Sequence, residues 1–353
     1  READSLKSVC LYSVDPKNGV QLTELWSSKL GQIASSMALD KWGAQGAFMV
    51  TSDTVKHALY DLYYFATADL KARKIANEQI VGLPGGFAVS KFGNLAFNRD
   101  GNRLQFGIAP KPKEEPKDTL PADEKFSLDV WSYRDTVLMP MQLVNKKRIA
   151  VYFPKEKRAL ALGDIELPSI TFAENGDAPY AIGTTSRPYS LYTGEDIQMY
   201  NPSDVYLIDL KSGKRTLIRK GGYGGTYLSP SAKYAAYYNL PDSSWYAIDT
   251  KTLKHTRLTA DIPYPFYNID DDHPGTPPLY GMSGWTTDEK MLIPDQFDLW
   301  LVDPAGKEPA QNLTKIGREK KTQFRFVNMS RVDGKSVVDL SRPMMFLSFN
   351  REN

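Results

Sequence analysis

Apolar and polar residues alternate in short runs along most of the chain, and turn-forming residues separate the runs. One pattern consists of an aromatic residue, a spacer, an aliphatic residue and an aspartate; it recurs at residues 12–15 (YSVD), 206–209 (YLID), 246–249 (YAID) and 300–303 (WLVD). Turn residues and a second alternating stretch follow each copy. Alternation, a turn and renewed alternation together predict a β-hairpin.

A second pattern places a polar turn before an apolar strand. It occurs at residues 98–101 (NRDG), 174–177 (ENGD), 229–232 (SPSA) and 286–289 (TTDE). Asn, Asp, Gly and Pro supply the backbone angles that such turns need. These turns divide the chain into similar units.

The clearest unit is residues 226–259, where four alternating stretches are joined by three turns. Four antiparallel strands in this length are typical of one β-propeller blade, as in WD40-like repeats. One such sheet cannot bury both of its faces alone, whereas blades stacked face to face do so. The repeats therefore predict an all-β propeller built of four-stranded antiparallel blades.

The blade boundaries follow from the repeats. We expect a half blade at 5–26, fuller blades at 44–81, 86–163, 168–220, 223–260 and 279–316, and a final half blade at 322–353. Residues 1–353 would then be a single propeller domain or a fragment of one, with seven or eight blades in the parent. Either the two half blades join and close the ring, which removes exposed strand edges, or the chain is cut within the propeller. The sequence leaves both open.

The unit 86–163 is too long for one blade and must carry an insertion. Residues 109–125 (APKPKEEPKDTLPADEK) are rich in proline and charge, so they cannot pack into a core. We expect a surface loop there, with a partner-binding segment as the alternative.

Composition agrees with this fold and excludes several function classes. The 353 residues include 12% aromatics, 25 Gly and 23 Pro, which suit short strands and turns. The net charge of +2 comes without a long basic run, which argues against a nucleic-acid partner. A single cysteine, Cys10, excludes an intrachain disulfide, and no apolar stretch is long enough for a membrane span. Because the chain starts at Arg1 rather than Met, we expect a processing or cloning boundary there rather than the true gene start.

Several local strings resemble one peptidase family. They are residues 128–133 (LDVWSY), 138–142 (LMPMQ), 280–286 (YGMSGWT), 297–304 (FDLWLVDP), 312–314 (NLT) with 317–318 (GR), 94–97 (NLAF) and 106–110 (FGIAP). Together they resemble the propeller of S9-type (prolyl oligopeptidase-like) serine peptidases from Bacteroides-like bacteria. The resemblance extends over residues 80–350.

This resemblance implies an exported, periplasmic peptidase whose propeller caps a separate α/β-hydrolase domain and admits only short peptides. The nucleophile motif G-x-S-x-G is absent, and the nearest string, residues 281–285 (GMSGW), lacks the second glycine at the right spacing. We therefore expect the non-catalytic module of a dipeptidyl peptidase-like or prolyl oligopeptidase-like enzyme, with a C-terminal hydrolase domain and peptides as partners. The alternative is a stand-alone propeller that binds peptides, glycans or a protein.

Neither a catalytic triad nor a cofactor site is expected on this chain. The only histidines are His57, His255 and His273, and none accompanies a strand-to-helix nucleophile. Aminopeptidase-type relatives grip the substrate amine with an acidic pair; the only adjacent glutamates, Glu114 and Glu115, lie in the insertion. This puts dipeptidyl-peptidase specificity in doubt.

Two further clusters are interpreted structurally. Residues 270–273 (DDDH) could offer carboxylates to Ca²⁺, but three adjacent acids cannot all face one ion, so we favour a solvated loop and assign no metal. Residues 221–225 (GGYGG) have no following Lys-Ser/Thr and are interpreted as a flexible link rather than a phosphate loop.

The aromatic residues Trp131, Tyr133, Trp245, Trp285 and Trp300 are expected mainly to pack between blades. One or two of them could form a stacking platform for a ligand. We take Trp131, Tyr133 and Trp285 as the candidate ligand or partner contacts.

Overall fold

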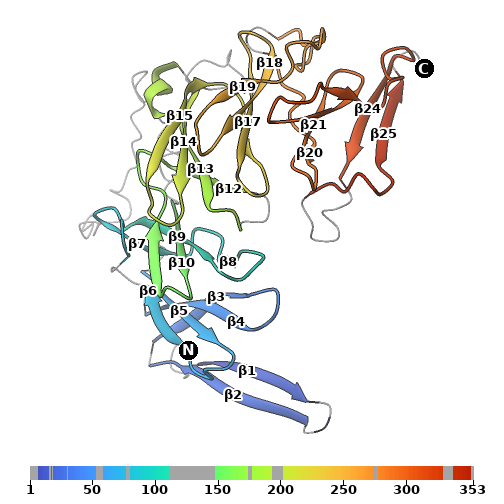
Figure 1. Cartoon of the computed structure of the whole chain (residues 1–353). Coiled ribbons are helices and arrows are strands. Elements are labelled where there is room, and N and C mark those ends of the chain that lie inside the picture. Colours follow the sequence, from blue (N-terminus) through green and yellow to red (C-terminus); the bar gives the residue numbers. More distant parts are fainter. Residues whose placement is uncertain are drawn as a thin grey trace, which may run out of the picture. The chain divides into compact units, whose positions relative to one another are not determined.

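A computed structural model describes residues 7–15, 17, 19–29, 31–52, 59–76, 80–111, 148–173, 177–192, 202–273, 275, 277–328 and 337–350. The chain divides into two compact units, Arg1–Ile170 and Thr171–Asn353. The described residues form antiparallel sheets and one 3-10 helix, η2 (Arg187–Tyr192), with no α-helix among them (Figure 1). None of the described helical segments has the length and apolar character needed to cross a membrane.

The first unit begins with the hairpin β1 (Ser8–Asp15) and β2 (Gly19–Ser27). A four-stranded sheet follows, made of β3 (Ile33–Leu39), β4 (Gln45–Thr51), β5 (Asp61–Ala66) and β6 (Arg73–Ala76). The next sheet has the order β11-β10-β9-β7 and consists of β7 (Phe87–Ser90), β9 (Leu104–Pro110), β10 (Arg148–Phe153) and β11 (Arg158–Ala161); β8 (Ala96–Phe97) also pairs with β9.

The second unit contains three consecutive four-stranded meanders. The first comprises β12 (Ser169–Phe172, whose first two residues belong to the first unit), β13 (Tyr180–Thr185), β14 (Ser203–Asp209) and β15 (Arg215–Gly222). The second comprises β16 (Thr226–Leu228), β17 (Tyr234–Asn239), β18 (Ser244–Asp249) and β19 (His255–Arg257). The third comprises β20 (Gly284–Trp285), β21 (Met291–Pro294), β22 (Leu299–Val302) and β23 (Gln311–Asn312), and the hairpin β24 (Thr322–Val327) and β25 (Met345–Asn350) follows.

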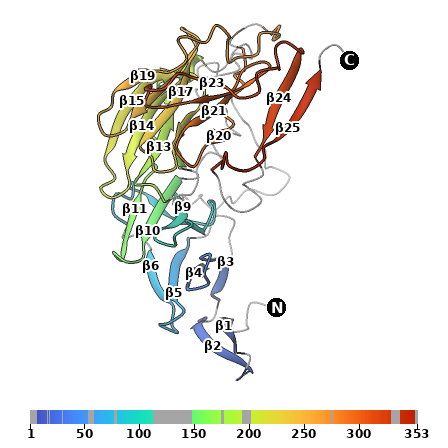
Figure 2. The same cartoon turned by 45° about the vertical axis from the view of Figure 1, so that its right-hand side comes forward.

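Consecutive sheets within each unit pack face to face. In the second unit, Tyr237 of β17 joins a core with Ile182 and Leu207 of the preceding sheet. The next residue, Tyr238, points to the other face, where it joins a core with Trp285 of the following sheet. Because successive strand residues face opposite sides, one strand serves two cores. Figure 2 shows these sheets of the second unit stacked one behind another.

The same arrangement holds at the other sheet boundaries. Leu292 and Leu301 pack with Phe346 of the hairpin β24–β25. In the first unit, Val9 of β1 packs with Phe48 of β4, whereas Met49 of β4 faces the core shared with the sheet β7–β11. Burial of both sheet faces is the physical requirement that defines propeller blades.

The predicted fold class is therefore confirmed: the chain is all-β, built of stacked, four-stranded antiparallel blades. The predicted blades 168–220, 223–260 and 279–316 each contain one observed sheet apart from a few end residues, and half blades stand at both ends. The blade predicted at 44–81 starts one strand too late, because β3 begins at Ile33. Blade number in the parent, ring closure and the single-domain organisation stay predictions.

The recurring aspartate closes the turn after the third strand of each meander in the second unit. Oδ1 of Asp209 accepts the N–H groups of Lys211 and Ser212 at 2.9 and 2.7 Å. Oδ1 of Asp249 accepts those of Lys251 and Thr252 at 3.1 and 2.8 Å. Asp303 uses both oxygens, with Oδ1 accepting the N–H of Ala305 and Oδ2 that of Lys307, each at 2.9 Å. This explains the repeat, since a short carboxylate that caps turn amides is what such a hairpin needs.

Candidate functional site

The first strands of three consecutive sheets line one pocket in the second unit. It has a volume of about 160 Å³ and is lined by Thr171 of β12, Thr226 and Tyr227 of β16, Ser283, and Trp285 of β20, among others. The first strand is the edge strand of each of these sheets. The pocket is therefore built by stacking, and no single sheet contains it.

Trp285 is the one predicted contact residue that the structure describes, and it lines this pocket. Its side chain is only 2% exposed and belongs to the core shared by the second and third meanders. Its backbone carbonyl accepts the N–H of Val338 at 2.8 Å, which fixes the short strand β20 from outside its own sheet. The indole is thus held rigidly at the pocket wall.

Two polar atoms of the pocket residues are buried without a hydrogen-bond partner in the described structure. They are the indole Nε1 of Trp285 and the hydroxyl Oγ1 of Thr226. Leaving a buried polar group unbonded costs about 1–3 kcal/mol, and such groups are rare in native structures. The indole can only donate and the hydroxyl can donate or accept, so a carbonyl oxygen is a group that each of them could bond.

The other candidate contacts, Trp131 and Tyr133, lie outside the described residues. The same holds for His57, for the glutamates Glu114 and Glu115, and for residues 112–125 of the predicted insertion. Thr226, in contrast, is a pocket residue that the sequence analysis did not single out. One threonine in a strand carries no signal, and only its position beside Trp285 in the pocket gives it a role.

Both described histidines have side-chain partners. Nδ1 of His255 lies 2.9 Å from the hydroxyl of Tyr237, and Nδ1 of His273 lies 2.8 Å from Oδ1 of Asp271. Burial, followed by the charge of Arg219, lowers the pKa of His255 below 6.5. The hydrogen bond to Asp271 raises the pKa of His273 above 6.5. Within the described residues, neither imidazole is bonded to a serine.

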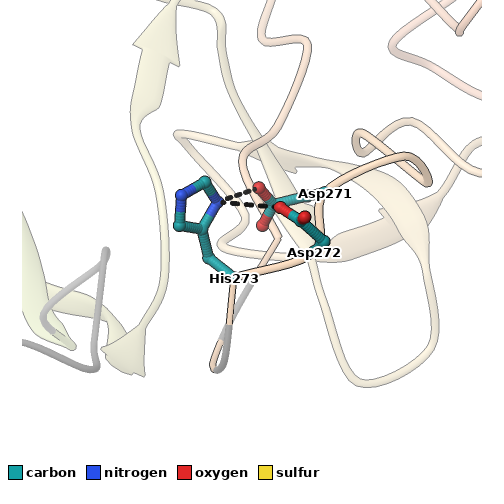
Figure 3. A group of neighbouring side chains, drawn as sticks. All are labelled: Asp271, Asp272 and His273. Carbon is teal, nitrogen blue, oxygen red and sulfur yellow. Dashed lines mark hydrogen bonds and ion pairs between the residues drawn. The ribbon is translucent and has the colours of Figure 1, made fainter.

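The acidic segment 270–273 divides into two parts. Asp271, Asp272 and His273 place their ligand atoms within 4.8 Å of one another, and Figure 3 shows both carboxylates turned toward the imidazole. Asp270 lies apart from this group, because its Oδ2 accepts a hydrogen bond from Nε2 of Gln296 at 3.0 Å. The side chains of Asp272 and His273 are 97% and 70% exposed, whereas that of Asp271 is only 8% exposed, so the cluster lies partly at the surface.

The glycine-rich segment 221–225 is held by specific contacts. The N–H of Gly221 donates to Asp204 at 2.9 Å, and the Tyr189 hydroxyl donates to the same carboxylate at 2.6 Å, which raises the pKa of Tyr189 to about 12. A Cβ on Gly224 would lie 2.8 Å from Cδ1 of Leu279. Gly224 thus lies close to the Leu279 side chain, and the flexible link stays a prediction.

A scan against protein-family models finds no match, and no curated protein matches the sequence. Among solved structures, the chain is similar to Porphyromonas gingivalis dipeptidyl peptidase 4, with 11% identity and a TM-score of 0.35 over 99% of this chain and 58% of that one. It is also similar to the β-propeller domain of the trilobed protease from Pyrococcus furiosus, with 11% identity and a TM-score of 0.34 over 98% and 87% of the two chains.

A third similar structure is an oligogalacturonate lyase in complex with manganese, with 12% identity and a TM-score of 0.34 over 86% of this chain and 69% of that one. This chain therefore spans less than two thirds of the dipeptidyl peptidase and most of the isolated protease propeller domain. The sheets of the chain are stacked, four-stranded antiparallel blades, as a propeller requires.

Proposed function

We propose that this chain is the non-catalytic propeller module of an exported, periplasmic S9-type serine peptidase. In this role it controls the access of peptides to a separate C-terminal α/β-hydrolase domain. The supporting observation is the run of stacked four-stranded sheets in the region whose strings resemble the propeller of that family. The sequence offers no G-x-S-x-G motif for a nucleophile of its own.

The pocket at β12, β16 and β20 is the proposed peptide contact. In a propeller, the strands at one edge of every blade line the central channel, which is the route that a gating module controls. Nε1 of Trp285 and Oγ1 of Thr226 are unbonded and buried in the pocket wall, so they would bond a peptide carbonyl once the wall opens toward it. The apolar side chains of Leu228 and Met282 beside them suit a small apolar side chain.

The catalytic part of the proposal is tested by assaying the isolated chain with chromogenic peptide substrates. We expect no turnover. Serine-dependent turnover that a fluorophosphonate blocks would contradict the proposal. Reading the open frame past Asn353 gives a second test, because a further domain with G-x-S-x-G is expected there.

The peptide contact is tested by equilibrium binding of short acetylated peptides to the wild type and to Trp285→Phe, which keeps a ring but removes the indole donor. We expect binding about tenfold weaker, the value of one well-formed hydrogen bond in a buried site. Trp245→Phe is the matched control, because the Nε1 of Trp245 is also buried and unbonded but Trp245 does not line the pocket. Equal losses in both variants would assign the effect to packing and remove the contact.

The alternative function is a stand-alone binding propeller for peptides, glycans or a protein. The same pocket with its two unbonded polar atoms favours it, since such a pocket binds a ligand with or without a hydrolase domain. A stop codon just past Asn353 would select this alternative over the peptidase module.

A further inference from the structure

A second pocket lies in the same unit, between the loop after β19 and the strand β24. It is open, with a volume of about 470 Å³, and its polar lining residues are Asn268, Asp270, Tyr280, Gln323 and Arg325. Asp270 and Tyr280 lie in segments that the sequence patterns singled out, but no pattern predicted a pocket there. Its lining combines one cationic, one anionic and several neutral polar side chains, so it offers hydrogen-bond donors and acceptors to a polar ligand.

The guanidinium of Arg325 is fixed in place by backbone carbonyls. Nη1 donates to the carbonyls of Asp295 and Phe324 at 3.2 and 3.1 Å, and Nη2 donates to the carbonyl of Gln296 at 2.9 Å. The ring of Tyr280 lies beneath it, 4.9 Å from Cζ to the ring centroid. These contacts orient the side chain without neutralising its charge.

Arg325 has no carboxylate partner among the described residues. The nearby carboxylate of Asp295 is bonded to Arg318 at 3.1 Å, and the three carbonyl bonds use at most three of the five N–H donors of Arg325. Burial lowers the pKa of Arg325, so water solvates its charge poorly. A half-buried arginine that is held rigidly and lacks an anion is typical of sites that bind a carboxylate through its fork of donors.

Asp270 supplies the complementary group. Its Oδ2 accepts the amide of Gln296 at 3.0 Å, and the backbone carbonyl of that same Gln296 accepts Arg325. Gln296 is only 5% exposed and therefore couples the two charged side chains as a fixed spacer. A ligand that offers a carboxylate to Arg325 and an N–H to Asp270 would match both.

We propose that this pocket binds the C-terminal end of a peptide, with the terminal carboxylate on Arg325 and the last backbone N–H directed to Asp270. A C-terminal residue carries its carboxylate and its backbone N–H on the same carbon. A cationic and an anionic side chain that lie in one pocket can therefore bind the two groups together. Gln323 stands two residues before Arg325 on the same face of β24 and adds an amide donor for the carboxylate. This inference rests on the proposed function, in that the ligand is a peptide.

The test compares two forms of one probe by titration calorimetry, acetylated trialanine with a free C-terminal carboxylate and the same peptide as a carboxamide. We expect the wild type to bind the carboxylate form about tenfold more tightly, since a charge-assisted bond carries the difference. Arg325→Met should bind the two forms equally, and Arg257→Met, at an arginine outside the pocket, should keep the preference.

Arg325→Lys is included because loss of three carbonyl bonds could unfold Arg325→Met. It keeps the charge but not the fork, so the preference should fall without vanishing. Glycine as a further probe separates a peptide terminus from a free amino acid, and tighter binding of glycine than of the peptide would overturn the peptide assignment.

The peptide contact at Trp285 and the carboxylate site at Arg325 can be refuted separately. Equal wild-type binding of both peptide forms, with weaker binding of both in Trp285→Phe, overturns the carboxylate site and leaves the proposed peptide contact intact. A carboxylate preference that disappears in Arg325→Met while Trp285→Phe binds normally supports this site and removes the first one. Binding of neither peptide overturns both.

Discussion

The hydroxyl of Tyr237 lies 2.9 Å from Nδ1 of His255, and the two residues link β17 and β19, the strands on either side of β18. The guanidinium of Arg219, from the preceding sheet, lies 4.4 Å from the centre of the Tyr237 ring. Arg219 is 9% exposed and bonds only the carbonyls of Tyr223 and Tyr238 in the described structure. A positive charge is therefore buried at a sheet interface beside a histidine.

This arrangement predicts a pH dependence of stability. Burial and then the Arg219 charge lower the pKa of His255 below 6.5, so the folded state favours the neutral imidazole. The stabilisation is fully present above the unfolded pKa of 6.5 and is lost as the pH falls toward the folded pKa. We expect His255→Gln to lose less thermal stability than the wild type between about pH 7 and pH 5.

His273 provides the control, because its pKa is shifted in the opposite direction from that of His255. Its pKa is raised by the bond to Asp271, so its contribution is complete below pH 6.5 and is lost as the pH rises through the folded pKa. In His273→Gln, thermal stability should therefore still fall steeply as the pH is lowered from about 7 to 5. The melting temperature is measured against pH. If it falls equally in His255→Gln and in the wild type over this range, His255 is not the cause of the pH dependence.

Two substitutions of Trp285 are expected to differ strongly in their effect on the free energy of unfolding. Trp285→Ala opens a cavity in the core that the second and third meanders share and should cost about 3–5 kcal/mol. Trp285→Phe loses less volume and also removes a buried, unbonded donor. Relief of that penalty, about 1–3 kcal/mol, should offset most of the lost packing. Urea denaturation measures both, and a Phe variant as unstable as the Ala variant would show that Nε1 is hydrogen-bonded in solution.

Asp295 is a buried acceptor at the end of β21. Its side chain is fully buried and accepts the backbone N–H groups of Phe297 and Asp298, each at 2.7 Å, the indole of Trp300 at 3.0 Å and Arg318 at 3.1 Å. Asp295→Ala leaves these donors unpaired and should lower the free energy of unfolding by about 3–5 kcal/mol. Asp295→Asn keeps one acceptor oxygen and should cost less.

The control for this change is Asp272→Ala, since the Asp272 side chain is 97% exposed. Its effect should stay within about 0.5 kcal/mol, as for most surface substitutions. Similar losses at positions 295 and 272 in urea denaturation would contradict the buried role of Asp295.

The turn aspartates give a prediction for the repeat itself. The N–H of Thr252 at 2.8 Å is the main reason that the pKa of Asp249 is lowered. Asp249→Ala should cost about 1–2 kcal/mol near neutral pH, and the difference from the wild type should shrink as the pH falls below the usual aspartate pKa of 3.8. Asp261→Ala, at an exposed residue outside this turn, is the comparison; an equal loss there would remove the turn as the cause.

The sequence alone determined the local architecture, because strand alternation and turn chemistry depend on near neighbours. Residues 226–259 show this most clearly, since the four stretches identified there became β16 to β19. β3 was missed because its pairing with β4 shifts register between Ser35 and Ala38, where Ser36 has a φ of 50°. A bulge of this kind breaks the two-residue period that sequence reading depends on.

The binding sites were decided by the tertiary structure. Trp285 could be singled out as an aromatic strand residue, but Thr226 became its neighbour in a pocket only when two sheets stacked. Likewise, Arg325 and Tyr280 are far apart in sequence and meet because β24 packs beside the loop that follows β19. Alternation specifies which face of a strand is buried, whereas the stacking of whole sheets determines which polar atoms remain unbonded.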